Sequence, residues 1–132
     1  MIPKYRAWDK QTQRIYYVAR LWFEQGILQN VWIETSKGMV SRRTLPEIIL
    51  MQYTGMHDSE GNDIYEGDIV KIPDDWDQFG MNCGEIYEVY FAFGGFRLKP
   101  KYTRGKGFYV EEEKVLIHLG NKYENPELME KI

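Results

Sequence analysis

The sequence predicts a mainly β fold (a β-rich α+β fold), and three observations support this prediction. Aromatic residues make up 15% of the 132-residue chain, and aromatic and β-branched residues are enriched in strands. Short runs of such residues alternate with clusters of Gly, Asn, Asp and Ser, which are typical of turns. The turns recur about every 8–12 residues, as they do in small barrels and sandwiches. We therefore expect N-terminal hairpins, a small barrel in the second half and a short C-terminal helix.

Two hairpins are predicted in the N-terminal part of the chain. Their strands are residues 5–8, 14–18, 20–23 and 27–34. Gly26 breaks the second hairpin, and residues 35–38 have the turn chemistry that closes it. The segment that follows is ambiguous, because Pro46 could open a short helix, whereas the composition of residues 48–54 favours an extended end.

The second half, from Tyr65 to Leu119, has the spacing of an SH3-like barrel. A Gly-Asp entry turn at Gly67 is followed by a long polar loop, a hairpin and a return strand. The predicted strands are residues 69–72, 85–91, 96–99, 108–110 and 115–119. The predicted C-terminal helix has Asn125 as its cap and Pro126 at its first position, where a missing N–H costs nothing.

Length, charge and cysteine content narrow the class of protein. We expect one domain over residues 1–132, with residues 1–54 and 55–132 as its alternative subdivision. A net charge of −3 and a pI near 5.4 do not indicate a globally basic nucleic-acid binder. Cys83 is the only cysteine, and a lone thiol suits a reducing compartment. Because the sequence shows neither a secretory apolar run nor the ~20 apolar residues of a membrane span, we expect a cytoplasmic protein without membrane contact.

Three segments of the chain together resemble the YopX family, small proteins encoded by bacteriophages and prophages. They are residues 5–9 (YRAWD), residues 50–70 (with LMQYTGMHD, GN and IYEGDIV) and residues 120–128 (GNKYENPEL). His57 stands where the family more often has a lysine, and residues 73–113 match no strict pattern of the family. The resemblance implies a β-rich fold, a phage or prophage gene and an address in the host bacterial cytoplasm. It implies no established activity, ligand or catalytic residue.

The matched residues also have a purely structural interpretation. Gly55, Gly61 and Gly67 suit turns that need a positive φ. The matched aromatic residues suit a core in which their polar atoms reach hydrogen-bond partners, and they are Trp8, Tyr53, Tyr65 and Tyr123.

No pattern in the sequence indicates a metal or cofactor site. His57, His118 and Cys83 lack the spacing of metal ligands. Residues 58–69 superficially resemble a calcium loop, but they have Asp63 and Ile69 where that loop needs glycine and glutamate. No phosphate-binding glycine motif occurs either. We therefore expect no metal and no cofactor.

Catalytic residues are not indicated either. The chain has no Gly-x-Ser-x-Gly elbow, and Cys83 has no histidine nearby in the sequence. Glu66 and Asp68, or the aspartates of the loop at residues 73–84, could supply paired carboxylates. The alternative is that Asp68 binds the backbone of its turn and that the loop is solvated. We expect no catalytic residues.

The distribution of charge is more informative. Residues 89–110 contain five cations and no acid, whereas residues 58–68 contain five acids and no Lys or Arg. The candidate nucleic-acid-binding residues of this basic-aromatic segment are Arg97, Lys99, Lys101, Tyr102, Arg104 and Lys106. Such residues on a hairpin can contact phosphates and stack on bases. They could equally pair with the acidic segment, within or between subunits, or belong to a solvated loop.

Three hypotheses about function follow. The preferred one is a non-enzymatic phage or prophage accessory protein that acts through protein contacts, as a homo-oligomer and with an unknown phage or host protein. The second is a nucleic-acid-binding module that uses residues 97–109. The third is a hydrolase built on the acidic loops.

Overall fold

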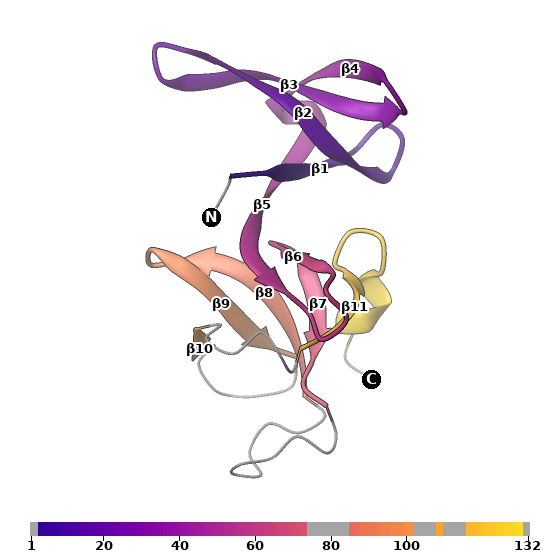
Figure 1. Cartoon of the computed structure of the whole chain (residues 1–132), viewed down its shortest axis with the longest axis vertical. Helices are drawn as coiled ribbons and strands as arrows, with labels where there is room; N and C mark the ends of the chain where they lie inside the picture. Colours follow the sequence, from indigo (N-terminus) through magenta and orange to yellow (C-terminus); the bar gives the residue numbers. More distant parts are fainter. Residues whose placement is uncertain (1–2, 74–84, 102–107, 110–115, 131–132) are drawn as a thin grey trace. The chain divides into compact units, whose positions relative to one another are not determined.

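The structure is a computed structural model that describes residues 3–73, 85–101, 108–109 and 116–130 (Figure 1). Antiparallel strands dominate the described residues, which confirms the predicted mainly β class. The chain divides into two compact units, Met1–Tyr53 and Thr54–Ile132. None of the helices in the described part of the chain has the length and apolarity that a membrane span needs.

Unit 1 is built from antiparallel neighbours in the order β4-β3-β2-β1-β5. The strands are β1 (Tyr5–Asp9), β2 (Arg14–Glu24), β3 (Ile27–Ser36), β4 (Met39–Thr44) and β5 (Ile48–His57), and the last of them continues into unit 2. The short 3-10 helix η1 (Leu45–Glu47) begins where Pro46 indicated it. Both predicted hairpins are confirmed by the pairing of β1 with β2 and of β2 with β3.

Two details of unit 1 differ from the prediction. The strands predicted at residues 14–18 and 20–23 are one continuous strand, β2, because a shift in register between Val18 and Arg20 bends the strand without ending it. Strand β4 was not predicted at all. Its sequence, MVSRRT, is too polar for a strand signal, and it is ordered by pairing with β3.

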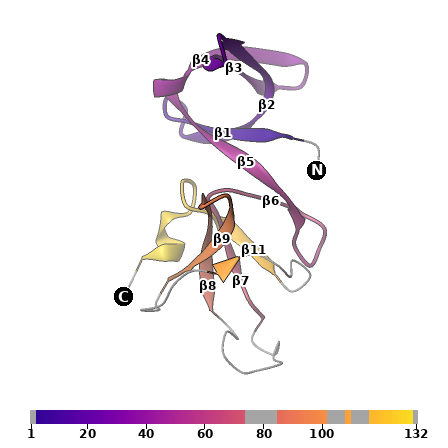
Figure 2. The ribbon, with the colours of Figure 1, turned by 90° about the vertical axis from the view of Figure 1, so that its left-hand side faces the viewer.

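The core of unit 1 lies inside a strongly curved sheet. Figure 2 shows β1 to β4 curling round, and the register shifts between β2 and β3 allow this bend. The fully buried apolar residues are Ala7, Val31, Ile33 and Ile48, with Tyr16, Val18, Leu21, Leu28 and Leu50 packed against them. The curl allows a short segment of chain to enclose an apolar cluster of its own.

A buried ion pair ties β4 to the end of β1. Asp9 is 0% exposed and accepts hydrogen bonds from Arg43 Nε at 3.1 Å, Arg43 Nη2 at 3.3 Å and Thr12 Oγ1 at 2.8 Å. Burial alone would raise the pKa of the Asp9 carboxyl, but these hydrogen bonds and the charge of Arg43 outweigh it and hold the pKa below its usual range.

Unit 2 contains a five-stranded antiparallel sheet in the order β10-β9-β8-β7-β11. Its strands are β7 (Asp68–Lys71), β8 (Ile86–Ala92), β9 (Gly95–Pro100), β10 (Phe108–Tyr109) and β11 (Ile117–Asn121). The short strand β6 (Asp63–Tyr65) follows β5 in the order of the other sheet. The SH3-like closure of this half into a barrel stays a prediction.

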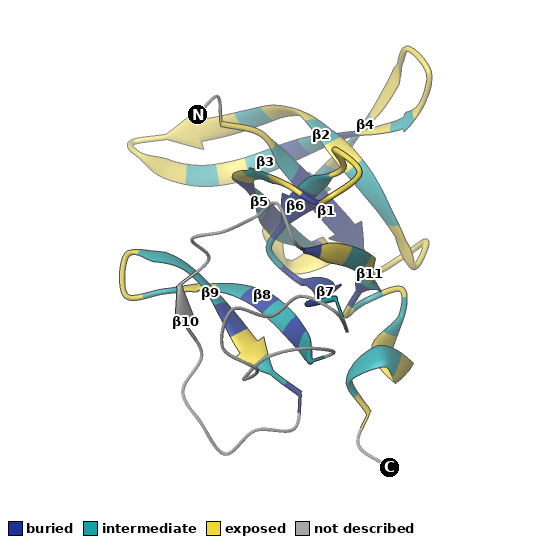
Figure 3. Ribbon diagram, turned by 60° about the horizontal axis from the view of Figure 1, so that its bottom comes forward, coloured by how far each residue is buried: buried dark blue, intermediate teal, exposed yellow. Residues whose placement is uncertain are grey.

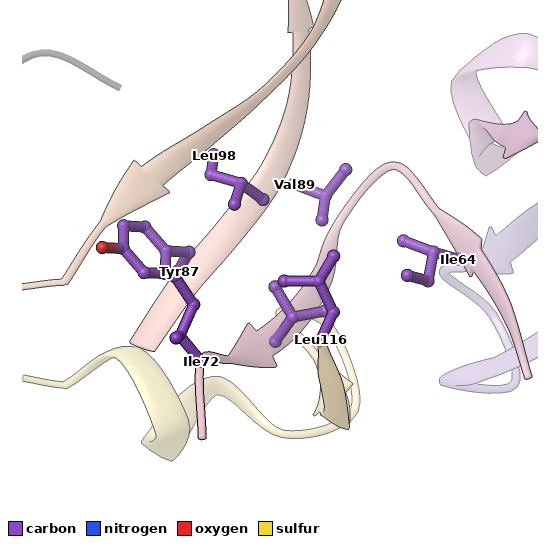
Figure 4. Close-up of a cluster of buried hydrophobic side chains, with 7 residues drawn as sticks. Ile64, Ile72, Tyr87, Val89, Leu98 and Leu116 are labelled. Carbon is purple, nitrogen blue, oxygen red and sulfur yellow. The ribbon is translucent and has the colours of Figure 1, made fainter. Parts of the chain in front are cut away.

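One face of the five-stranded sheet carries the core of unit 2 (Figures 3 and 4). The cluster consists of Ile64, Val70, Ile72, Tyr87, Val89, Leu98 and Leu116. Side chains alternate along β8, where Tyr87 and Val89 are buried and Glu88 between them is less so. Burial, with a smaller contribution from Glu85, raises the pKa of Tyr87 to about 12.

The predicted C-terminal helix is the single 3-10 turn η3 (Pro126–Met129), and the capping role predicted for Asn125 is wrong. Its side chain caps nothing in η3. The Oδ1 atom instead accepts the backbone N–H of Asn121 at 3.2 Å, because the tight loop before η3 folds the amide back towards β11. Asn125 therefore ties the last helix to the last strand.

Gly120 is expected to be intolerant of any side chain. A Cβ at this position would meet the amide of Asn125 and lie 3.1 Å from Leu128 Cδ1. We predict that Gly120→Ala lowers the free energy of unfolding by about 1–3 kcal/mol through overpacking. Urea denaturation followed by tryptophan fluorescence measures this effect, and a loss below about 0.5 kcal/mol would show that η3 moves away at little cost.

Candidate contact surfaces

The structure describes three of the six residues that the sequence proposes for nucleic-acid binding. Arg97 and Lys99 lie on β9, and Lys101 follows its end. Tyr102, Arg104 and Lys106 lie outside the described residues. The aromatic pair of the same segment forms β10, in which Phe108 stands opposite Leu98 and Tyr109 opposite Arg97.

Arg97 and Lys99 share the face of the sheet that points away from the core. Leu98 between them is buried, and their partners on β8 are Tyr90 and Glu88. Lys101 is buried, and its backbone N–H donates to the carbonyl of Ile86 at 2.9 Å. The structure thus brings two of the predicted cations to one outer face and separates the third from them.

The end of the β8–β9 hairpin carries aromatic residues that the sequence analysis did not select. Phe93 is 85% exposed, and its ring centroid lies 4.8 Å from the guanidinium carbon of Arg97. Phe91 and Phe96 meet edge to face with centroids 5.1 Å apart. Gly94 and Gly95 predict a turn here, but the two connecting residues are Phe93 and Gly94, because Gly95 pairs with Ala92.

A second apolar end occurs in unit 1, at the turn between β2 and β3. Trp22, Phe23 and Ile27 are exposed by 50%, 55% and 63%. Trp22 Nε1 donates to Glu24 Oε1 at 3.3 Å, and Glu24 stands opposite Ile27 in register. We call these three residues the β2–β3 apolar end. Their residue types indicated strands, but nothing in the sequence indicated that their side chains are exposed.

Asp68, one of the acidic residues that could have served catalysis, is engaged in a turn of unit 2, whereas the candidate aspartates at residues 74–77 lie outside the described residues. Asp68 is 0% exposed; its Oδ2 accepts the backbone N–H of Tyr65 at 2.8 Å and its Oδ1 lies 3.3 Å from Nε2 of His118. The alternative interpretation of Asp68, as a residue that binds the backbone of its turn, is confirmed.

Asp58 organises the preceding turn in the same way. Its carboxylate accepts the backbone N–H groups of Glu60 and Asn62, at 2.9 and 2.8 Å, and the side-chain amide of Asn62 at 3.0 Å. Burial alone would raise the pKa of Asp58, but the hydrogen bonds from Asn62 and Glu60, helped by the charge of His118, lower it below its usual range.

A further histidine–aspartate pair lies nearer the surface. His57 Nε2 is 3.1 Å from Asp63 Oδ1, and the side chains are 53% and 30% exposed. Within residues 3–73, 85–101, 108–109 and 116–130, no group of three or more His, Cys, Asp or Glu side chains is placed to hold a metal ion.

Known proteins share the sequence pattern and the fold of this chain. The family model described as YopX protein matches residues 4–130. The chain belongs to the YopX family. A crystal structure of protein EF1440 from Enterococcus faecalis has 26% identity and a TM-score of 0.67, over 98% of this chain and 99% of that one. A crystal structure of protein yopX from Bacillus subtilis has 23% identity and a TM-score of 0.63, over 98% and 97%. No curated protein matches the chain.

The YopX signature maps largely onto turns and buried aromatic residues. Gly61 and Gly67 have φ values of 87° and 85° in turns, as predicted, whereas Gly55, with φ 86°, lies within strand β5 and not in the predicted turn. Trp8, Tyr53 and Tyr65 are buried, whereas Tyr123 is only partly so. The third signature segment forms a loop in which Asn121 Oδ1 accepts the N–H groups of Tyr123 and Glu124, at 2.9 and 2.8 Å.

Proposed function

We propose that this YopX-family protein acts through protein contacts rather than catalysis, and that the first of these contacts joins two copies of the chain. The observation that carries the proposal is the β2–β3 apolar end, where three large side chains are each at least half exposed. Exposed apolar clusters of this kind mark protein-binding surfaces. Tryptophan in particular contributes strongly to binding energy when a partner desolvates it.

The state of the acidic residues supports a non-enzymatic role. The carboxylates of Asp58 and Asp68 accept hydrogen bonds from backbone N–H groups of their turns, so these oxygens are engaged in holding the fold. A general base instead has to reach the proton that it removes from the substrate.

The biological setting is part of the same proposal. The family resemblance suggests an accessory protein of a bacteriophage or prophage, working in the cytoplasm of the bacterial host. A phage or host protein would then be the second partner, bound at the surfaces that self-association leaves open.

A second copy is proposed as the first occupant because the apolar end is suited to symmetric pairing. Trp22 and Ile27 are on the same side of the hairpin as Glu24, while Phe23 stands opposite Leu28, which belongs to the core side. Two such ends packed around a two-fold axis would bury aromatic against aliphatic surface on both copies. Closed pairs of this kind are the commonest form of oligomer.

The molar mass in solution tests the proposal. Light scattering coupled to size-exclusion chromatography, over a range of protein concentrations, should give a mass above the monomer's 15.7 kDa. The Trp22→Ser, Ile27→Ser double variant should return the monomer mass, because it removes both large apolar side chains that share one side of the hairpin. Tyr17→Ser is the matched control: Tyr17 is 66% exposed on the same strand but distant from the end, and its loss should leave the mass unchanged. A wild-type monomer at every concentration would overturn self-association.

A further inference from the structure

The end of the β8–β9 hairpin has features that its role as a connection does not require. The connecting residues are Phe93 and Gly94, between the paired residues Ala92 and Gly95. Both have a positive φ, 52° and 81°, as in a type I′ turn. The first position of this turn favours Asn, Asp or Gly, and a bulky residue there is strained.

The residue with the strained backbone, Phe93, holds its aromatic ring in solvent. Asparagine would fit the backbone of this turn better, yet the chain holds a phenylalanine whose side chain is almost fully exposed and buries little apolar surface. Such outliers cluster at functional sites. The ring is also held in place, because Arg97 lies over one of its faces at 4.8 Å while the exposure leaves the other face to solvent.

Among the described residues of β8 and β9, cations outnumber acids on the outer face, although the chain as a whole carries −3. On the outer face of β8 and β9, Arg97 and Lys99 are accompanied by one acid, Glu88. Lys122 binds that acid at 3.2 Å, so its charge is offset. Tyr90 stands opposite Arg97 and adds a second aromatic residue to the same face.

We propose that this outer face, made by Phe93, Tyr90, Arg97 and Lys99, binds single-stranded nucleic acid. A base stacks on the open face of Phe93, and the two cations contact the phosphates on either side of it. Aromatic rings that stack on bases beside a cationic track are the general design of single-strand binding surfaces. An acidic protein segment would also be attracted to the cations, but it would use the exposed ring only if it carried an aromatic side chain at the right position, whereas every nucleotide carries a base. The inference is independent of the proposed self-association, which rests on unit 1.

Binding is tested by fluorescence anisotropy with the 132-residue chain and labelled 20-mers of oligo-dT, oligo-U and a mixed-sequence DNA duplex. We expect the single strands to bind more tightly than the duplex. Two phosphate contacts give a slope of about −1.4 in log K against log salt for single strands, which is about a 7-fold weakening between 50 and 200 mM salt.

Two variants test the residues. Phe93→Asn should weaken single-strand binding at least 5-fold without lowering the melting temperature, because asparagine fits the turn; Lys99→Ala should weaken binding and flatten the salt dependence by about half. Tyr17→Ser, which replaces an exposed aromatic residue of unit 1 outside both proposed surfaces, is the control and should bind as the wild type does.

Three results would overturn the proposal: no single-strand binding at 50 mM salt, equal or tighter binding of the duplex, or unchanged binding by a folded Phe93→Asn variant. Polyglutamate that bound where both nucleic acids failed would assign the face to an acidic protein instead.

Discussion

Replacing Arg43 with alanine is expected to lower the free energy of unfolding by about 3 kcal/mol. The side chain of Asp9 is 0% exposed, and the Arg43 guanidinium donates two of its three side-chain hydrogen bonds. Without Arg43 the carboxylate stays buried with Thr12 as its remaining side-chain donor. Removing one partner of a buried ion pair is more damaging than removing both, because an uncompensated charge is left in the interior.

Arg42→Ala is the matched control for this prediction. Arg42 is the neighbouring residue on β4 and is exposed, and its backbone carbonyl accepts a hydrogen bond from Arg43 Nη1 at 3.0 Å. We expect its replacement to change the unfolding free energy by less than about 0.5 kcal/mol. Urea denaturation curves of both variants and of the wild type measure the difference. Equal effects of the two substitutions would show that the Asp9 pair does not stabilise unit 1.

The same pair predicts a dependence on pH. The pKa of Asp9 is lower in the folded chain than in the unfolded one, where it is about 3.9. A depressed folded pKa contributes stability that is fully present above the unfolded value and is lost as the pH falls through the folded one. Wild-type stability should therefore drop in strong acid, and Arg43→Ala, with a smaller pKa difference, should lose less over that range.

Local features of this fold were predictable from the sequence because local chemistry determines them. The turns at Gly26, Gly61 and Gly67 need a positive φ, which glycine supplies at little steric cost. Pro46 fixed the start of η1 in the same way. Most of the strands between these turns followed from aromatic and β-branched content, and the polar strand β4 was the exception.

Features that depend on distant residues were not predictable. Strand β4 carries few apolar residues and exists through its pairing with β3. The hydrogen bonds of Asp9 to Arg43 join residues 34 positions apart. Asn125 stands where the sequence predicts a helix cap, but its Oδ1 accepts the backbone N–H of Asn121 instead.

For the candidate surfaces, too, the sequence predicted which residue types occur but not which of them are exposed. Composition identified the segment with Arg97 and Lys99, but it could not show that Lys101 turns into the protein. Nor could it rank Phe93 above other aromatic residues, because the exposure of a ring depends on what the rest of the sheet covers. The residue types at a surface were therefore visible in the sequence, whereas their accessibility required the fold.

Replacing Asp68 with alanine is expected to destabilise unit 2 by about 3 kcal/mol, since the buried N–H of Tyr65 would lose its acceptor and the contact with His118 would be lost as well. The Tyr65 N–H that Asp68 binds at 2.8 Å is in a buried residue, and His118 Nε2 lies 3.3 Å away. Because Asp68 follows Gly67 at the start of β7, its loss also removes the acceptor that closes the turn.

Asp63→Ala is the control, because it removes the other histidine–aspartate pair of the same unit. The side chains of His57 and Asp63 are 53% and 30% exposed, so this pair should contribute less than about 1 kcal/mol. Asp68→Asn keeps an oxygen that can accept the Tyr65 N–H, and we expect it to recover part of the loss. Chemical denaturation of the three variants separates these effects. A loss for Asp68→Ala no larger than that for Asp63→Ala would show that the contacts of Asp68 with Tyr65 and His118 do not stabilise unit 2 more than the exposed pair does.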